Sequence, residues 1–292
     1  MNVITLQSKR YPKLLKEIGK DAPKRLYYKG IWPLDTVRNK DDIFENCLAV
    51  VGSRQMTTYG RQVVEKIVGE IAAAGVTIVS GFMYGVDAAV HQAVLKVGGR
   101  TIAVMPCGID LIHPAYQQDL YVEILNNNGL ILSEYEGNIP PALWTYPRRN
   151  RIVAGLSRAA LIIEAGEKSG SLITASFAKK FKRKVFVVPG PITSENSKGI
   201  MQLIKEGAEA VSSAQDILKY YKIKGVAKID RGRTSIIGGA EQEIINQLQK
   251  EALDIDAISR NLGMPAAKMG TILSMMQLKG QIKQEGNKYY IN

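Results

Sequence analysis

Between residues 47 and 211 the chain alternates short, continuously apolar segments with longer amphipathic ones. The short segments are typical of strands that are buried on both faces, whereas the amphipathic segments have the length and period of helices. The predicted strands are residues 47–52, 76–80, 100–105, 130–133, 159–165 and 184–190. The predicted helices lie near residues 60–74, 86–97, 115–127, 149–157, 172–181 and 198–207.

This alternation predicts an α/β domain over residues 47–221, built on a doubly wound, mainly parallel sheet. Strands that are buried on both faces need helices on both sides of the sheet. Ligands of such sheets bind at the carboxyl ends of the strands. Residues 1–46 are more polar, and we expect them to form an N-terminal extension, helical or irregular, that packs on this domain.

The C-terminal part of the chain has a different pattern. A basic segment that ends in two glycines, residues 222–239, predicts a linker. Residues 240–292 then show three helical segments followed by a hairpin, which is the pattern of a small winged-helix domain. This segment has six basic and six acidic residues, so we expect it to contact a protein or act as an auxiliary element rather than bind duplex DNA alone.

The net charge of +12 therefore lies in residues 1–239 and favours a polyanion, nucleic acid first, as the partner. The longest apolar runs are far shorter than the roughly 20 residues that a membrane-spanning helix needs, so no membrane insertion is expected. The N-terminus lacks the apolar stretch of a secretory signal, which favours a cytoplasmic location. Cys47 and Cys107 have no metal-binding spacing, so we expect buried thiols, no metal and no cofactor.

Four predicted strands end in loops that contain glycine, at residues 51–60, 80–91, 105–114 and 167–175. Such loops let a phosphate approach the backbone and the start of a helix, but glycine also serves simply to close a tight turn. Neither the dinucleotide fingerprint after the first strand nor a P-loop is present, which disfavours hydride transfer and P-loop ATP hydrolysis. The hydroxyls of the last loop either cap a helix or contact phosphate.

Three arginines, Arg148, Arg149 and Arg151, are predicted to lie in the first turn of the helix near residues 149–157. Cations there oppose the helix dipole, so the arrangement favours a bound anion shared between the guanidinium groups and the free N–H groups. Arg54, after the first strand, is expected at the same edge of the sheet. The alternative is that the protein's own carboxylates, for example Glu134, Glu136 or Glu164, pair with the arginines.

Candidates for catalysis are few. His91 follows Asp87 by one helical turn, which could orient the imidazole but is interpreted as an ordinary structural pair. Glu134 and Glu136 alternate at the exit of a strand, where acidic side chains are usually solvated. The residues alone therefore identify no catalytic group.

Six motifs follow one another along the chain: VGSRQMTTYG, SGFMYGVDAAVH, GGRTIAVMPCGIDLIHP, YPRRNRIVAGLS, EAGEKSGSLITASFA and VFVVPGPITSENSKGIMQLIKEGA. In these motifs the sequence resembles the DNA-processing protein A family (DprA, also called Smf). The resemblance implies an extended Rossmann-like domain and a winged helix in a protein that is not an enzyme. It also implies binding and protection of incoming single-stranded DNA, a homodimer formed through the Rossmann-like domain, and loading of the recombinase RecA in natural transformation or recombination.

The resemblance also implies a set of DNA-binding residues. Phe82, Met83, His113 and Met201 depart from the usual family residues, and residues 113–143 contain no lysine or arginine. For base stacking we consider Phe82, Tyr84 and Trp144, with a place in the core as the equal alternative for these aromatic residues. The implied DNA-binding residues are Gly52, Ser53, Arg54, Gly81, Arg148, Arg149, Asn150, Arg151, Ser169, Gly170, Ser171 and Thr174.

Two other function classes stay open at this point. A Rossmann-like nucleotide phosphoribohydrolase of the lysine-decarboxylase-like kind would use the glycine loops to hold a phosphate. Its PGGxGTxxE loop is missing, since the sequence there is EAGEKSGSLITA. An adaptor would use the winged helix to contact another protein.

Overall fold

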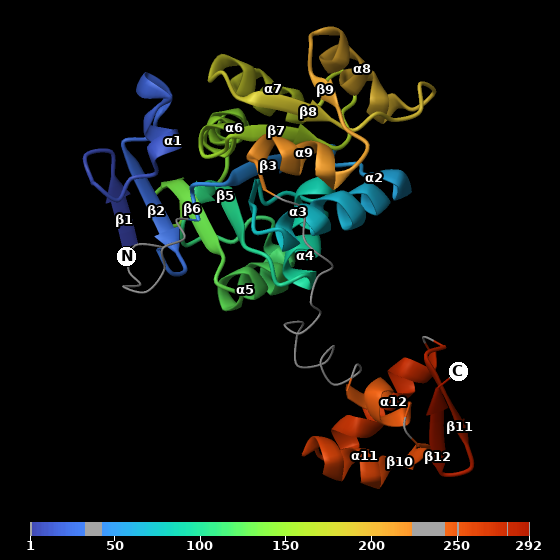
Figure 1. Cartoon of the computed structure of the whole chain (residues 1–292). Helices are drawn as coiled ribbons and strands as arrows, with labels where there is room; N and C mark the ends of the chain where they lie inside the picture. The colour runs from blue at the N-terminus through green and yellow to red at the C-terminus, as the bar shows by residue number, and fades with distance from the viewer. Residues whose placement is uncertain (1, 33–42, 224–242, 250, 279, 292) are drawn as a thin grey trace. The chain divides into compact units, whose positions relative to one another are not determined.

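The computed structural model describes residues 2–32, 43–223, 243–249, 251–278 and 280–291 (Figure 1). The chain forms two compact units, residues 1–227 and residues 228–292. The predicted basic linker, residues 222–239, lies outside the described residues from residue 224 onward.

The first unit is built on a nine-stranded sheet with the order β1-β2-β6-β5-β4-β3-β7-β8-β9. All pairs from β6 through β9 are parallel, which confirms the predicted doubly wound α/β fold. The chain begins the parallel part at β3, proceeds to β6 on one side, and then places β7 to β9 on the other. The switch point between β3 and β7 is where such sheets bind ligands. The predicted strands are observed as β3 (Cys47–Val51), β4 (Thr77–Ser80), β5 (Thr101–Gly108), β6 (Leu130–Tyr135), β7 (Ala159–Ile162) and β8 (Lys184–Val187).

The N-terminal extension was predicted to be helical or irregular, and this prediction is incomplete. The extension also adds two antiparallel strands to the sheet. β2 (Arg25–Lys29) pairs with β6, and β1 (Asn2–Thr5) pairs with β2 at the edge. β1 has only two apolar residues in a row, and β2 has three between Arg25 and Lys29, so both lack the longer apolar run by which the other strands were identified. The two-residue strand β9 (Glu209–Ala210) was not predicted either, because it has no apolar run.

Helices cover both faces of the sheet (Figure 1). Alternate residues of each strand enter different apolar clusters, for example Val79 on one face and Ile78 on the other. One face carries α1 (Lys13–Lys16), α6 (Thr145–Gly155), α7 (Ser171–Lys180) and α8 (Lys198–Lys205). The other carries α2 (Thr58–Val63), the π-helical turn η3 (Val64–Val68), α3 (Gly69–Ala73), α4 (Val86–Lys96), α5 (Gln118–Asn126) and α9 (Ala214–Tyr221). Short 3₁₀ turns are η1 (Gly19–Asp21), η4 (Ala115–Gln117) and η5 (Glu195–Ser197).

The second unit is a small winged-helix domain with its own apolar core. Its helices α11 (Ile255–Leu262) and α12 (Ala266–Leu278) pack with a three-stranded sheet of β10 (Leu253–Asp254), β12 (Lys288–Ile291) and β11 (Ile282–Glu285). The hairpin of β11 and β12 is the predicted wing, and β10 is an additional strand. Across the described part of the chain, no helix combines the length and apolar character that crossing a membrane requires.

Two predictions about buried groups have different outcomes. Cys47 and Cys107 are buried free thiols, as predicted. His91 is also buried, but it does not form the expected pair with Asp87. Its Nε2 lies 2.6 Å from the Gly81 carbonyl oxygen, and its Nδ1 lies 2.7 Å from the Thr101 hydroxyl. Burial lowers the pKa of His91 to about 4, so the ring is neutral near pH 7.

This buried imidazole predicts a pH dependence of stability. The pKa of His91 is about 4 in the folded chain and about 6.5 when exposed, so the unfolded chain takes up the proton first. The stability is therefore fully present at neutral pH and is lost as the pH falls from 6.5 toward 4, by about 3 kcal/mol. Urea unfolding of wild type and His91→Gln across this range should show their stability difference changing by that amount. Parallel stability curves for the two proteins would contradict the prediction.

Candidate nucleic-acid interface

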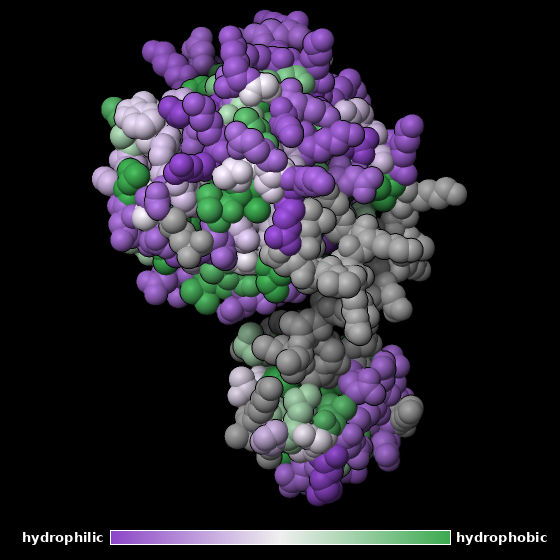
Figure 2. All heavy atoms as spheres, turned by 90° about the vertical axis from the view of Figure 1, so that its left-hand side faces the viewer, coloured by the Kyte–Doolittle hydropathy of each residue, from purple (hydrophilic) through white to green (hydrophobic). Residues whose placement is uncertain are grey.

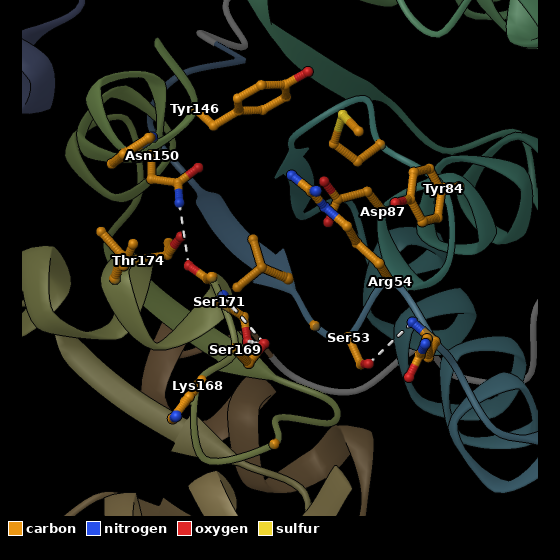
Figure 3. Close-up of a pocket in the computed structure, with 18 of the residues that line it drawn as sticks. Ser53, Arg54, Tyr84, Asp87, Tyr146, Asn150, Lys168, Ser169, Ser171 and Thr174 are labelled. Carbon is orange, nitrogen blue, oxygen red and sulfur yellow. Dashed lines mark hydrogen bonds between the residues drawn. The ribbon is translucent and has the colours of Figure 1, made fainter. Parts of the chain in front are cut away.

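A cavity of about 570 Å³ opens at the carboxyl ends of the strands beside the switch point. We call it the main cavity. Figure 3 shows Tyr146 and Asn150 facing Arg54 and Tyr84 across it, with Lys168 and Ser169 on a third side. Of the predicted DNA-binding residues, it is lined by Gly52, Ser53, Arg54, Arg149, Asn150, Ser169, Gly170, Ser171 and Thr174.

The loop after β3 is held in place by hydrogen bonds from distant parts of the chain. The Ser53 hydroxyl donates to Asn196 at 3.2 Å, and the Asn196 amide donates to the Gln55 carbonyl at 2.6 Å. On the other side, the Val86 N–H donates to the Ser53 carbonyl. Gly85 permits this approach, because it has a φ of +78° and a Cβ there would collide with the Ser53 and Arg54 backbone. Arg54 therefore projects from a fixed loop.

Arg54 is the basic side chain that the fold presents most directly to a ligand. Its guanidinium lies 5.2 Å from the centroid of the Tyr146 ring and 5.6 Å from that of Tyr84. No carboxylate of the described residues lies within ion-pair distance of it. The Tyr146 hydroxyl lies 2.8 Å from Nε2 of His113, which orients the ring. Burial lowers the pKa of His113, and the positive charge of Arg54 lowers it further.

Arg149 forms part of the floor of the main cavity instead of its rim. Only 4% of its surface is exposed, and its Nη1 donates to the Val104 carbonyl at 2.9 Å. Within the described residues its Nε has no hydrogen-bond partner. Burial lowers the pKa of this guanidinium, while the nearby Asp87 carboxylate raises it. Burial also raises the pKa of Asp87, and Arg149 opposes that shift.

The structure corrects the predicted role of Gly81. It does not line the main cavity. A Cβ at this position would overlap the Arg149 guanidinium and the Asp87 carboxylate, so the glycine provides the space in which these two buried groups lie near each other. Its place in the sequence reflects packing beneath the cavity.

The structure also corrects the prediction for Arg148 and Arg151. α6 begins at Thr145 instead of near residue 149, because Pro147 is tolerated in a first turn, where N–H groups have no partner in the helix. The arginines therefore lie beyond the first turn, where the effect of the dipole is weak. Both pair with Glu134, Arg148 at 3.0 Å and Arg151 at 2.6 Å. For Arg148 and Arg151 the alternative is therefore correct, namely pairing with the protein's own carboxylate. Both arginines line a second hollow and not the main cavity.

The loop before α7 closes the main cavity. The hydroxyls of Ser169 and Ser171 lie 2.7 Å apart, and the Ser171 N–H donates to the Ser169 hydroxyl at 3.4 Å. The Asn150 amide donates to the Gly170 carbonyl, which ties the loop to α6. The N-cap position of α7 is Gly170 and has no side-chain cap, so the two hydroxyls line the cavity and bond within their own loop. Thr174 is almost fully buried behind them.

Among the aromatic candidates, Phe82 is a core residue and not a stacking surface, because it is fully buried and packs edge-on against Tyr121. Trp144 is exposed but packs against Tyr135, outside the main cavity. Tyr84 lines the cavity and is 43% exposed. Tyr146 was missed, although it begins the motif that carries the arginines.

Sequence reasoning also missed Lys168 and Asn196, which line the same cavity. Lys168 lies within the predicted loop at residues 167–175, so its neighbours were an available signal. For Asn196 the sequence contained no such signal, because its hydrogen-bond partner Ser53 lies 143 positions away in the chain. Only the packing of the loop before α8 against the loop after β3 reveals its role.

Comparison with known protein families gives two matches. The family model described as DNA recombination-mediator protein A matches residues 2–222. The model described as DprA winged helix domain matches residues 238–288. The two matches correspond to the two compact units of the chain.

Individual proteins agree with these matches. Protein Smf of Escherichia coli is 36% identical over 242 residues, which cover 80% of this chain but 65% of that protein. The chain thus spans less than two thirds of the length of this relative. DNA processing protein A of Streptococcus pneumoniae has a similar structure (TM-score 0.67, 38% identity, covering 75% of this chain and 73% of that one). So does that of Helicobacter pylori, whose structure is described as giving insight into its single-stranded DNA binding mode (TM-score 0.65, 32% identity, 76% and 96%).

The packing around Gly81 leads to a prediction with an internal control. In Gly81→Ala the new methyl group must displace Arg149 or Asp87, two nearly buried charged groups that lie close to each other, so we expect a loss of about 1–3 kcal/mol of stability. In Gly170→Ala the methyl group meets no atom and φ is −60°, so stability should stay within about 0.5 kcal/mol. Urea unfolding of the two variants tests this, and equal stability would show that Gly81 has no packing role.

Proposed function

Because this chain belongs to the DNA recombination-mediator protein A family, we propose that it binds single-stranded DNA in the main cavity, with Arg54 as the principal phosphate contact. The observation that carries the proposal is the position of this guanidinium between the rings of Tyr84 and Tyr146. A cation without a carboxylate partner beside accessible aromatic rings, here the exposed Tyr84 and the half-buried Tyr146, is the arrangement with which proteins hold unpaired nucleotides.

The shape of the main cavity supports a single strand over a duplex. Its aromatic faces lie in a concave site, so a base must leave its stack to reach them. The polar groups that surround it, such as Asn150 and Ser169, are able to contact phosphate and sugar but do not form a rigid pattern for one base. We therefore propose that binding depends on the backbone and its flexibility and shows little dependence on sequence.

The wider role follows from the family. We propose that the chain protects incoming single-stranded DNA and loads the recombinase RecA in natural transformation or recombination, in the cytoplasm and without catalysing a reaction. The family description as a recombination mediator and the single-strand binding described for the Helicobacter pylori protein support this role. We further propose a homodimer formed through the Rossmann-like domain, and a winged-helix domain that contacts a protein or acts as an auxiliary element.

The proposal predicts a specific defect in Arg54→Ala. Loss of a charge-assisted contact of about 1.5–3 kcal/mol should weaken binding of a single-stranded oligonucleotide about 10- to 100-fold. The dependence of log affinity on log salt should become shallower by about 0.7, because one phosphate contact is lost. Fluorescence anisotropy at several salt concentrations measures both quantities.

The matched control is Lys66→Ala, which removes one exposed positive charge from the π-helical turn η3 and should leave binding nearly unchanged. The same titrations with a duplex of equal length should show weaker binding by the wild type. If Arg54→Ala binds like the wild type, or if single and double strands bind equally well, the assignment of the main cavity is wrong.

A further inference from the structure

A second hollow, of about 860 Å³, lies on the other side of α6 from the main cavity. We call it the N-terminal groove, because η1 and the segment that leads into β2 form one wall. The carboxyl end of β6 and the side chains of Arg148 and Arg151 form the opposite wall. Pro147 lines both hollows, so the start of α6 is the ridge between them.

The acidic residues of the N-terminal groove are already paired within the protein. Glu134 accepts hydrogen bonds from both Arg148 and Arg151, so one carboxylate faces two guanidinium groups. The Asp21 carboxylate lies 2.6 Å from Nζ of Lys180. Both negative charges are therefore engaged, and the excess charge of the groove is positive.

Three further basic residues of the groove have no such partner. Lys20, Lys24 and Arg25 are exposed, and within the described residues no carboxylate lies at ion-pair distance from any of them. Arg25 donates a hydrogen bond to the Tyr27 side chain, and the Glu136 charge acts on it from a greater distance. The three basic residues lie within six positions of one another around the entry to β2. Figure 2 faces the side of the molecule that carries β1 and β2, where hydrophilic side chains cover much of the upper part. A cluster of unpaired cations in a concave surface attracts a polyanion.

A third hollow also borders the main cavity, at Arg54 and Tyr84. Its basic residues are Arg54 and Arg61, and it contains the acidic residue Asp119. The N-terminal groove has five basic and two acidic lining residues, so its excess of positive charge is larger. Since phosphate contacts dominate the affinity for nucleic acid, the charge favours the N-terminal groove as the path of the strand.

We propose that the N-terminal groove binds the continuation of the single strand held in the main cavity. Its phosphates cross the ridge at Pro147 and contact Lys20, Lys24 and Arg25. Glu134 holds Arg148 and Arg151 in the wall behind them. The proposal rests on the function proposed for the main cavity, and it assigns to the N-terminal segment a role in ligand binding beyond completing the sheet.

The test uses the full chain and a series of oligothymidylates from the dinucleotide upward, with affinity measured by fluorescence anisotropy. The triple variant Lys20→Ala, Lys24→Ala, Arg25→Ala should bind the shortest oligonucleotides like the wild type. It should lose the gain in affinity that the wild type shows once the strand is long enough to cross the ridge. On long strands its salt dependence should be shallower by about 2, for three lost phosphate contacts.

The matched control removes three charges that line none of these three hollows, in Lys66→Ala, Lys96→Ala, Arg100→Ala, and should leave the length dependence unchanged. If the two triple variants behave alike, or if the first loses affinity equally at every length, the proposal is wrong. An effect of Arg61→Ala on long strands without one from the first triple variant would place the path at Arg54 and Tyr84 instead. Arg54→Ala distinguishes failure of the function proposed for the main cavity from failure of the proposal for the N-terminal groove. Its loss of binding at all lengths supports the main cavity, independently of the result for the groove.

Discussion

The buried charge of Arg149 is the constraint on which the geometry of the main cavity depends. A guanidinium inside a protein must have compensating polar groups, because desolvation of a charge is costly. Here the Val104 carbonyl and the Asp87 carboxylate provide them, and Gly81 leaves the space in which they meet. This arrangement fixes the start of α6 against β5. It therefore also fixes Tyr146 and Asn150 on the rim of the cavity.

Fixing α6 in this way divides its positive charge. Arg149 points inward, whereas Arg148 and Arg151 point to the other side of the helix, where Glu134 holds them. Arg149 on the one side, and Arg148 and Arg151 on the other, therefore do not bind an anion at the start of the helix in the way the sequence predicted. The main cavity is left with Arg54 and Lys168 as basic residues that no carboxylate of the described residues pairs with. A long polyanion therefore needs further contacts outside this cavity.

The N-terminal segment connects this charge distribution to the fold. β2 pairs antiparallel with β6, so the chain that enters β2 lies next to the carboxyl end of β6. Basic residues near the start of β2 are thereby brought close to Glu134 and to the second side of α6. The winged-helix domain contributes no net charge, which agrees with a role other than neutralising phosphates.

Periodicity and local motifs were sufficient for the parallel sheet, its covering helices and the winged helix. An apolar strand or an amphipathic helix is recognisable from its own residues. The loops at Ser53, Arg54 and Ser169 were also predictable, because the ends of adjacent parallel strands must meet at one edge. β1 and β2 were not, since strands with apolar runs of only two or three residues carry little signal of their own.

The direction in which each side chain points was decided by the tertiary structure alone. Arg148, Arg149 and Arg151 look equivalent in the sequence, yet helical rotation sends one into the floor of the main cavity and two toward Glu134. Phe82 and Tyr84 are two positions apart, but one is fully buried in the core and the other lines the cavity. The sequence determined which residues gather at this edge of the sheet. Which of them stay free for a ligand depended on partners such as Glu134 and Asp87 that only folding brings within reach, because charge pairing acts through space and not along the chain.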